Sequence, residues 1–132
     1  MNPEILRRLR ERAAGCCEYC WLPTGGHALP FQVDHIIAKQ HGGADNLDNF
    51  AYACVHCNCY KGPNVAGIDP DTNMVVRLYH PRLDRWTDHF RWSGPLILPV
   101  SAIGRATVRT LNMNDPESVM LRESLEQERN RR

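Results

Sequence analysis

The sequence predicts an α+β fold, because the expected elements follow the order helix, cysteine knuckle, strand, knuckle, helix, strands and helices. At 132 residues the chain has the size of one domain, and a structural metal would help so short a chain to fold. Its 42% apolar and 23% charged residues are typical of a soluble globular protein. We therefore expect residues 1–132 to form a single domain.

The first expected element is a helix over about residues 3–14. Asn2 is a good cap, and Pro3 suits the first helical position. Gly15 is a typical helix stop. Apolar residues recur every four positions along the segment, at Ile5, Leu9 and Ala13.

The middle of the chain predicts two strands and a short helix. The segment "FQVDH" at residues 31–35 alternates apolar and polar residues, as a strand does, and "FAYA" at residues 50–53 fits a return strand. The segment "CVHCNCYK" at residues 54–61 predicts a short helix that Gly62 ends.

The rest of the chain predicts further strands and two helices. Residues 67–73 are turn-forming. Strand-like segments follow at residues 74–80, 89–92 and 96–100. Ser101 can cap a helix that runs to about Leu111, and a last helix can begin at Pro116. Side chains between residues 80 and 92 favour aromatic packing over a second site: His80, Trp86, His89 and Trp92.

Charge and hydropathy limit the possible locations and partners. No apolar run approaches the roughly 20 residues of a membrane span, and the first residues lack the apolar stretch of a signal peptide. We therefore expect a cytoplasmic, reducing location. The net charge of +1 favours a solvated surface on charge alone, although the basic residues are mostly arginine, which binds phosphate well. The candidate phosphate contacts are Arg82, Arg85, Arg91, Arg105 and Arg109.

Two cysteine pairs of the form Cys-x-x-Cys are the clearest motif. In a reducing location, six cysteines indicate metal rather than disulfides, although disulfides or scattered buried thiols remain the alternative. Two such pairs complete the four-sulfur site of structural Zn²⁺, with Cys17, Cys20, Cys54 and Cys57 as ligands. Cys16 and Cys59 are interpreted as bystanders.

A second group of residues suits hydrolysis at a metal. Asp34 offers a hard oxygen for Mg²⁺ or Mn²⁺, Asn58 offers a neutral amide oxygen, and His35 can accept a proton near neutral pH. Lys61 shares a helix face with Asn58 and can attract phosphate. Each of these residues also has an ordinary structural role, as a cap, a brace or a core histidine, and so does Asn49. Only the joint pattern indicates catalysis.

That joint pattern resembles the HNH endonucleases. The residues that carry the resemblance are the two cysteine pairs, "DHI" at Asp34, Gly42 and Gly43, "DNF" at Asp48, "CVHCN" at Cys54, and Lys61 with Gly62. Ala38 and Phe50 depart from the common family pattern. The resemblance covers about residues 16–63, and the segments around residues 78–92 and 104–114 resemble a C-terminal extension of small bacterial and phage-type members.

The resemblance implies a ββα-metal core, clamped by the four-cysteine zinc site and extended by C-terminal strands and helices over about residues 64–132. It implies that His35 is the general base, that Asp34 and Asn58 hold one divalent cation, and that Asn49 braces the loop and orients His35. The implied substrate is DNA, with RNA as the alternative, cut to 5′-phosphate and 3′-hydroxyl ends. Two rival hypotheses are a zinc-ribbon module that binds nucleic acid without cutting it and a redox protein built on Cys-x-x-Cys.

Overall fold

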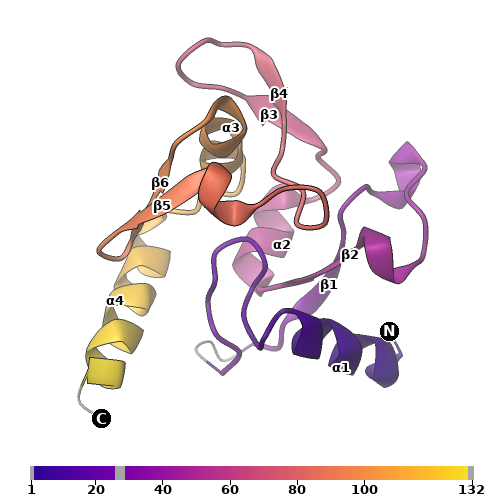
Figure 1. The fold of residues 1–132 in the computed structure, drawn as a ribbon, viewed down its shortest axis with the longest axis horizontal. Helices are drawn as coiled ribbons and strands as arrows, with labels where there is room; N and C mark the ends of the chain where they lie inside the picture. Colours follow the sequence, from indigo (N-terminus) through magenta and orange to yellow (C-terminus); the bar gives the residue numbers. More distant parts are fainter. Residues whose placement is uncertain (1, 26–28, 131–132) are drawn as a thin grey trace.

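The computed structural model describes residues 2–25 and 29–130 and confirms the α+β prediction (Figure 1). The helices are α1 (Pro3–Arg12), α2 (Val55–Lys61), α3 (Ala102–Thr110) and α4 (Pro116–Asn130). The strands are β1 (Gln32–His35), β2 (Phe50–Ala53), β3 (Ala66–Ile68), β4 (Val75–Arg77), β5 (Phe90–Ser93) and β6 (Leu96–Pro99). Short 3-10 helices lie between some of these elements: η1 (Lys39–His41), η2 (Leu47–Asn49) and η3 (Trp86–Asp88). Among the described residues, no helix has the length and apolar character needed to cross a membrane.

Helix α1 begins where the sequence predicted and ends earlier. The side chain of Asn2 accepts a hydrogen bond from the Glu4 N–H at 2.8 Å, so the predicted cap is confirmed. The helix ends at Arg12, because Ala14 and Gly15 adopt the left-handed conformation with φ of 54° and 73°. Leu9 is buried, and the helix packs against β2.

Strands β1 and β2 form an antiparallel hairpin in the register that pairs Gln32 with Ala53 and His35 with Phe50. All four residues of β2 are buried, between α1 and the rest of the core. Helix α2 follows β2 directly and packs against β1. The three elements therefore form a compact strand–strand–helix unit, which Figure 1 shows beside α1.

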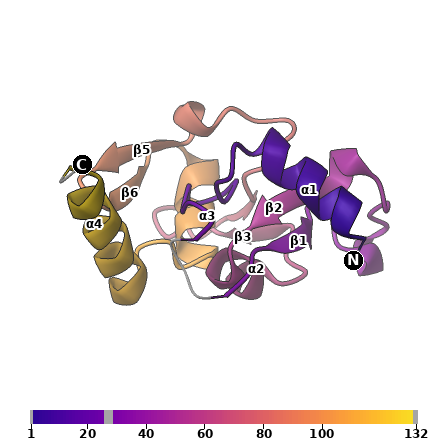
Figure 2. The same ribbon diagram turned by 90° about the horizontal axis from the view of Figure 1, so that it is seen from below.

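The C-terminal half adds two more antiparallel hairpins, β3–β4 and β5–β6, which pack against α3. Figures 1 and 2 show α4 and the β5–β6 hairpin at one end of the molecule and α1 at the other. The sequence analysis missed β3, whose three residues show no alternation. Gly67 lets this strand lie against α3, since a Cβ there would approach Thr110 Oγ1 to 2.1 Å.

A buried ion pair fixes the turn between β3 and β4. Asp69 is fully buried, and both of its oxygens accept hydrogen bonds from the Arg105 guanidinium at 2.9 Å. Hydrogen bonding to Arg105 lowers the pKa of Asp69 well below its usual range. Arg105 is therefore engaged within the protein.

The packing interpretation of residues 80–92 holds for Trp86, which lies in the core with Tyr79 and Phe90, whereas Trp92 is 44% exposed and packs against Trp86 from outside. The ring of Trp86 lies 5.1 Å from Phe90 and 5.5 Å from Trp92, between ring centres. Trp86 is buried, and its indole N–H donates to the carbonyl oxygen of Tyr19 at 2.9 Å. The C-terminal half thereby contacts the first cysteine knuckle (residues 17–20) directly.

Candidate functional site

Four cysteine side chains converge in the interior, as the sequence predicted. The sulfur atoms of Cys17, Cys20, Cys54 and Cys57 all lie within 4.8 Å of one another, and all four residues are buried. The first pair lies in the turn after α1, and the second lies at the start of α2, where Cys54 is the helix cap. Four sulfur donors placed in this way can hold one metal ion, and they are the ligands that structural zinc prefers.

The other two cysteines, Cys16 and Cys59, lie outside this cluster. Cys16 forms an isolated backbone bridge with Pro23, and Cys59 is exposed on α2. Within the cluster, hydrogen bonds from the neighbouring cysteines, Cys17 first, lower the pKa of Cys54. Hydrogen bonds within the same cluster, those from Cys17 first, raise the pKa of Cys20 and Cys57, so these shifts favour the thiolate at Cys54 and the thiol at Cys20 and Cys57.

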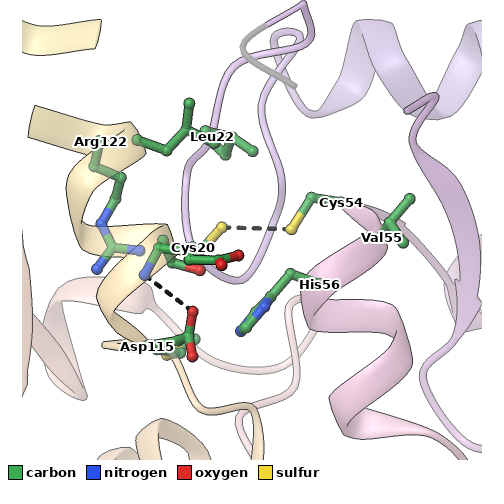
Figure 3. Close-up of a pocket in the computed structure, with 11 residues that line it drawn as sticks. Cys20, Leu22, Cys54, Val55, His56, Asp115 and Arg122 are labelled. Carbon is green, nitrogen blue, oxygen red and sulfur yellow. Dashed lines mark hydrogen bonds between the residues drawn. The ribbon is translucent and has the colours of Figure 1, made fainter. Parts of the chain in front are cut away.

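A cavity of about 110 Å³ lies beside the cysteine cluster, between α2 and α4 (Figure 3). Figure 3 shows the sulfur atoms of Cys20 and Cys54 facing each other, with His56 and Arg122 at the border. Arg122 is held by the carbonyl oxygen of Pro95 at 2.8 Å. None of the residues that the sequence analysis selected for hydrolysis lines this cavity.

Asp34 lies in a buried polar network that connects three elements. Its carboxylate accepts a hydrogen bond from the Tyr19 hydroxyl at 2.5 Å and forms an ion pair with the Lys61 ammonium at 3.2 Å. Burial raises the pKa of Asp34, and the charge of Lys61 opposes this effect. The network joins the first cysteine knuckle to β1 and α2.

Lys61 is one of the most deeply buried side chains, with 1% of its surface exposed. Besides Asp34, its ammonium donates to the carbonyl oxygens of His35 and Ile36 at 3.2 and 3.0 Å. The sequence analysis expected this lysine to attract phosphate, which requires an ammonium group that the substrate can reach. The structure instead directs it back over β1, because α2 packs across that strand.

Asn58 lies on the same side of β1 as Asp34. Its amide nitrogen donates to Gln32 Oε1 at 2.5 Å, and Gln32 and Asp34 share one face of the strand because side chains alternate. Its amide oxygen accepts no hydrogen bond within residues 2–25 and 29–130. The capping alternative is wrong, since Asn58 lies inside α2 and Cys54 is the cap.

His35 projects from the opposite face of β1. Its ring packs edge-on against Phe50 with ring centres 5.0 Å apart. Its Nε2 lies 2.7 Å from Asp45 Oδ1, and Asp45 also pairs with Lys39 at 3.1 Å. The sequence analysis did not select Asp45; its position just after Gly42 and Gly43 was the available signal.

Asn49 closes the loop between β1 and β2. Its amide nitrogen donates to the carbonyl oxygens of Ile37 and Ala44, and its amide oxygen accepts from the Ile37 N–H, each at 2.9 Å. Gly43 allows this closure, since a Cβ there would meet the Ile37 carbonyl oxygen at 1.7 Å. The loop next to His35 is therefore held by one buried amide.

Residues 17–63 match the family model described as HNH endonuclease. This segment contains all four clustered cysteines, the β1–β2 hairpin and α2. Comparison with curated proteins and with solved structures gave no significant match.

The cysteine cluster predicts that metal and fold are lost together. We expect Cys57→Ser to lose bound zinc and to unfold, because metal binding and folding are coupled in such sites. Cys59→Ser, which changes an exposed cysteine on the same helix, should keep both. Elemental analysis and circular dichroism measure the two effects, and a folded, reduced wild-type protein without zinc would contradict the assignment.

The Asp34–Lys61 pair predicts a large loss of stability when one partner is removed. Lys61→Met leaves the Asp34 charge buried with only Tyr19 beside it, which should lower the free energy of unfolding by about 3–5 kcal/mol. The exposed Lys39→Met is the control and should change it by about 0.5 kcal/mol or less. Urea unfolding at pH 7 measures both, and Asp34→Asn combined with Lys61→Met should recover part of the loss.

Proposed function

We propose that this chain is a metal-dependent endonuclease that hydrolyses phosphodiester bonds of DNA, because residues 17–63 form an HNH endonuclease domain. The family match carries this proposal, since HNH endonucleases act on nucleic acid. We also propose that residues 1–132 form a single nuclease unit, which the contacts between the two halves and their shared hydrophobic core support.

We assign His35 as the general base. A neutral imidazole within reach of a water molecule can take its proton as the water attacks phosphorus. The ring of His35 is partly exposed, with 23% of the side chain accessible, so water can reach it. Phe50 and Asp45 limit its rotation, which favours one orientation toward the substrate.

We assign Asp34 and Asn58 as the ligands of one Mg²⁺ or Mn²⁺ ion. The donor types fit a hard cation, and the Asn58 amide oxygen has no hydrogen-bond partner among the described residues. A divalent ion held there would supply stabilisation of the negative charge that develops during phosphodiester hydrolysis. Asp34 must share its carboxylate with Tyr19 and Lys61.

We propose that Asn49 and Lys61 hold other site residues in place and do not contact the substrate. We assign Asn49 to hold the loop beside His35, on the strength of its three hydrogen bonds to loop backbone. We assign Lys61 to hold Asp34, in place of the phosphate contact suggested by the sequence, since its ammonium is buried.

Binding of the nucleic-acid backbone requires basic side chains that are not already paired within the protein. Arg105 pairs with Asp69, and Arg82 forms an ion pair with Glu18, so neither is free in this structure. Arg85, Arg91 and Arg109 are exposed and form no ion pair with the described residues. We propose these three as phosphate contacts.

Cleavage by a His35 variant tests the proposed function. His35→Ala should abolish cutting of supercoiled plasmid in the presence of Mg²⁺ or Mn²⁺, with zinc content and melting temperature near those of the wild type. The exposed His41→Ala is the matched control and should cut normally. A wild-type protein that binds plasmid but never cuts it would favour the zinc-ribbon binding module instead.

Substitutions of Asn58 test its role as a metal ligand. Asn58→Ala and Asn58→Ser should lose nearly all cutting, whereas Asn58→His should keep some, with a changed metal preference, because imidazole can coordinate. The control is Asn64→Ala, at an exposed position just after α2. The measurement is cleavage rate against Mg²⁺ or Mn²⁺ concentration, and normal cutting by Asn58→Ala at low metal would remove Asn58 from the site.

A further inference from the structure

A carboxylate that no sequence motif marked contacts the ring of His35. Asp45 Oδ1 lies 2.7 Å from His35 Nε2, within hydrogen-bond distance. An ionised carboxylate accepts hydrogen bonds and donates none. When the ring of His35 is neutral, this hydrogen bond requires the hydrogen on Nε2 and leaves the lone pair on Nδ1.

The loop that carries Asp45 is fixed next to that residue. The carbonyl oxygen of Ala44 accepts a hydrogen bond from the Asn49 amide at 2.9 Å. One residue earlier in the same loop, Gly43 lies against the backbone of Ile37. Asp45 thus begins from a fixed backbone position, and its carboxylate meets a ring that Phe50 already confines.

Neither stability nor substrate binding accounts for this acid. Its side chain is 59% exposed, and its ion pair with Lys39 joins two exposed groups, which adds little to stability. A negative charge beside the proposed cleavage site repels the phosphates of the substrate. An acidic side chain at position 45 therefore opposes nucleic-acid binding, and its presence needs another explanation.

We propose that Asp45 is a positioning residue for His35. It holds Nε2–H by a hydrogen bond, selects one tautomer, and leaves Nδ1 as the atom that accepts the proton from water. This inference rests on the proposed function of His35 as general base. It adds to that function the identity of the reacting nitrogen and the side chain that selects it.

Kinetics of plasmid cleavage separate positioning from substrate binding. Asp45→Ala should lower kcat by about tenfold or more, a part of the 10²–10⁴-fold that a general base contributes. Its KM should stay the same or fall, because a repulsive charge is removed. Asp45→Asn keeps an acceptor oxygen and should give an intermediate kcat. Lys39→Ala removes the other partner of Asp45 and should leave kcat near the wild-type value.

The tautomer of His35 gives a readout that does not depend on cleavage. Long-range ¹H–¹⁵N NMR of the wild type at pH 8 should show the Nε2–H form, and Asp45→Ala should show a mixture of both forms. A wild-type Nδ1–H form, or an unchanged kcat in Asp45→Ala, would overturn the inference. An Nε2–H form in a wild-type protein that does not cut would overturn the proposed function, and the catalytic role of Asp45 with it, while the contact itself would stand.

Discussion

Four sulfur atoms hold together two places that are distant in the sequence. The first cysteine pair lies before β1 and the second lies after β2, so the cluster closes both ends of the segment that carries the proposed site. Tyr19 lies inside the first Cys-x-x-Cys turn, and its hydroxyl reaches Asp34. Any displacement of that turn therefore moves the hydrogen-bond donor of Asp34. The geometry of the acid depends on the cysteine cluster, although the cluster itself has no open position for chemistry.

The C-terminal half supports the same turn from the other side. Trp86 donates to the carbonyl oxygen of Tyr19, and Arg82 forms an ion pair with Glu18, which lies in the turn as well. Glu18 also accepts the Tyr52 N–H at 2.7 Å, so it connects the turn to β2. The segment outside residues 17–63 is therefore part of the framework of the site.

Local sequence signals predicted the elements of the fold that depend on neighbouring residues. The cap at Asn2, the strand "FAYA" and the helix stop at Gly62 all rest on neighbouring residues, and the structure confirms each of them. The cysteine cluster was predictable because two Cys-x-x-Cys pairs are typical of tetrahedral zinc sites. Strand β3 was not predictable, since it depends on pairing with β4 and on packing against α3 and not on alternation within its own three residues.

The candidate site, like the fold, was predictable from the sequence only in part. The residue types at positions 34, 35 and 58 indicated the chemistry, but not their directions: alternation along β1 sends Asp34 and His35 to opposite faces. The burial of Lys61 was missed because it depends on the packing of α2 across β1. The contact of Asp45 with His35 was missed because it depends on the path of a loop that Asn49 closes.

The separation of the two cysteine pairs has a consequence for the order of folding. Cys20 and Cys54 lie 34 residues apart along the chain, and closing a loop of that length costs about 3 kcal/mol of chain entropy. One knuckle alone can capture an ion through two neighbouring thiolates at almost no such cost. The second knuckle can join only when the β1–β2 hairpin has brought the chain back. Completion of a four-sulfur metal site is therefore coupled to formation of the hairpin, so an ion bound there would stabilise the hairpin together with the two knuckles.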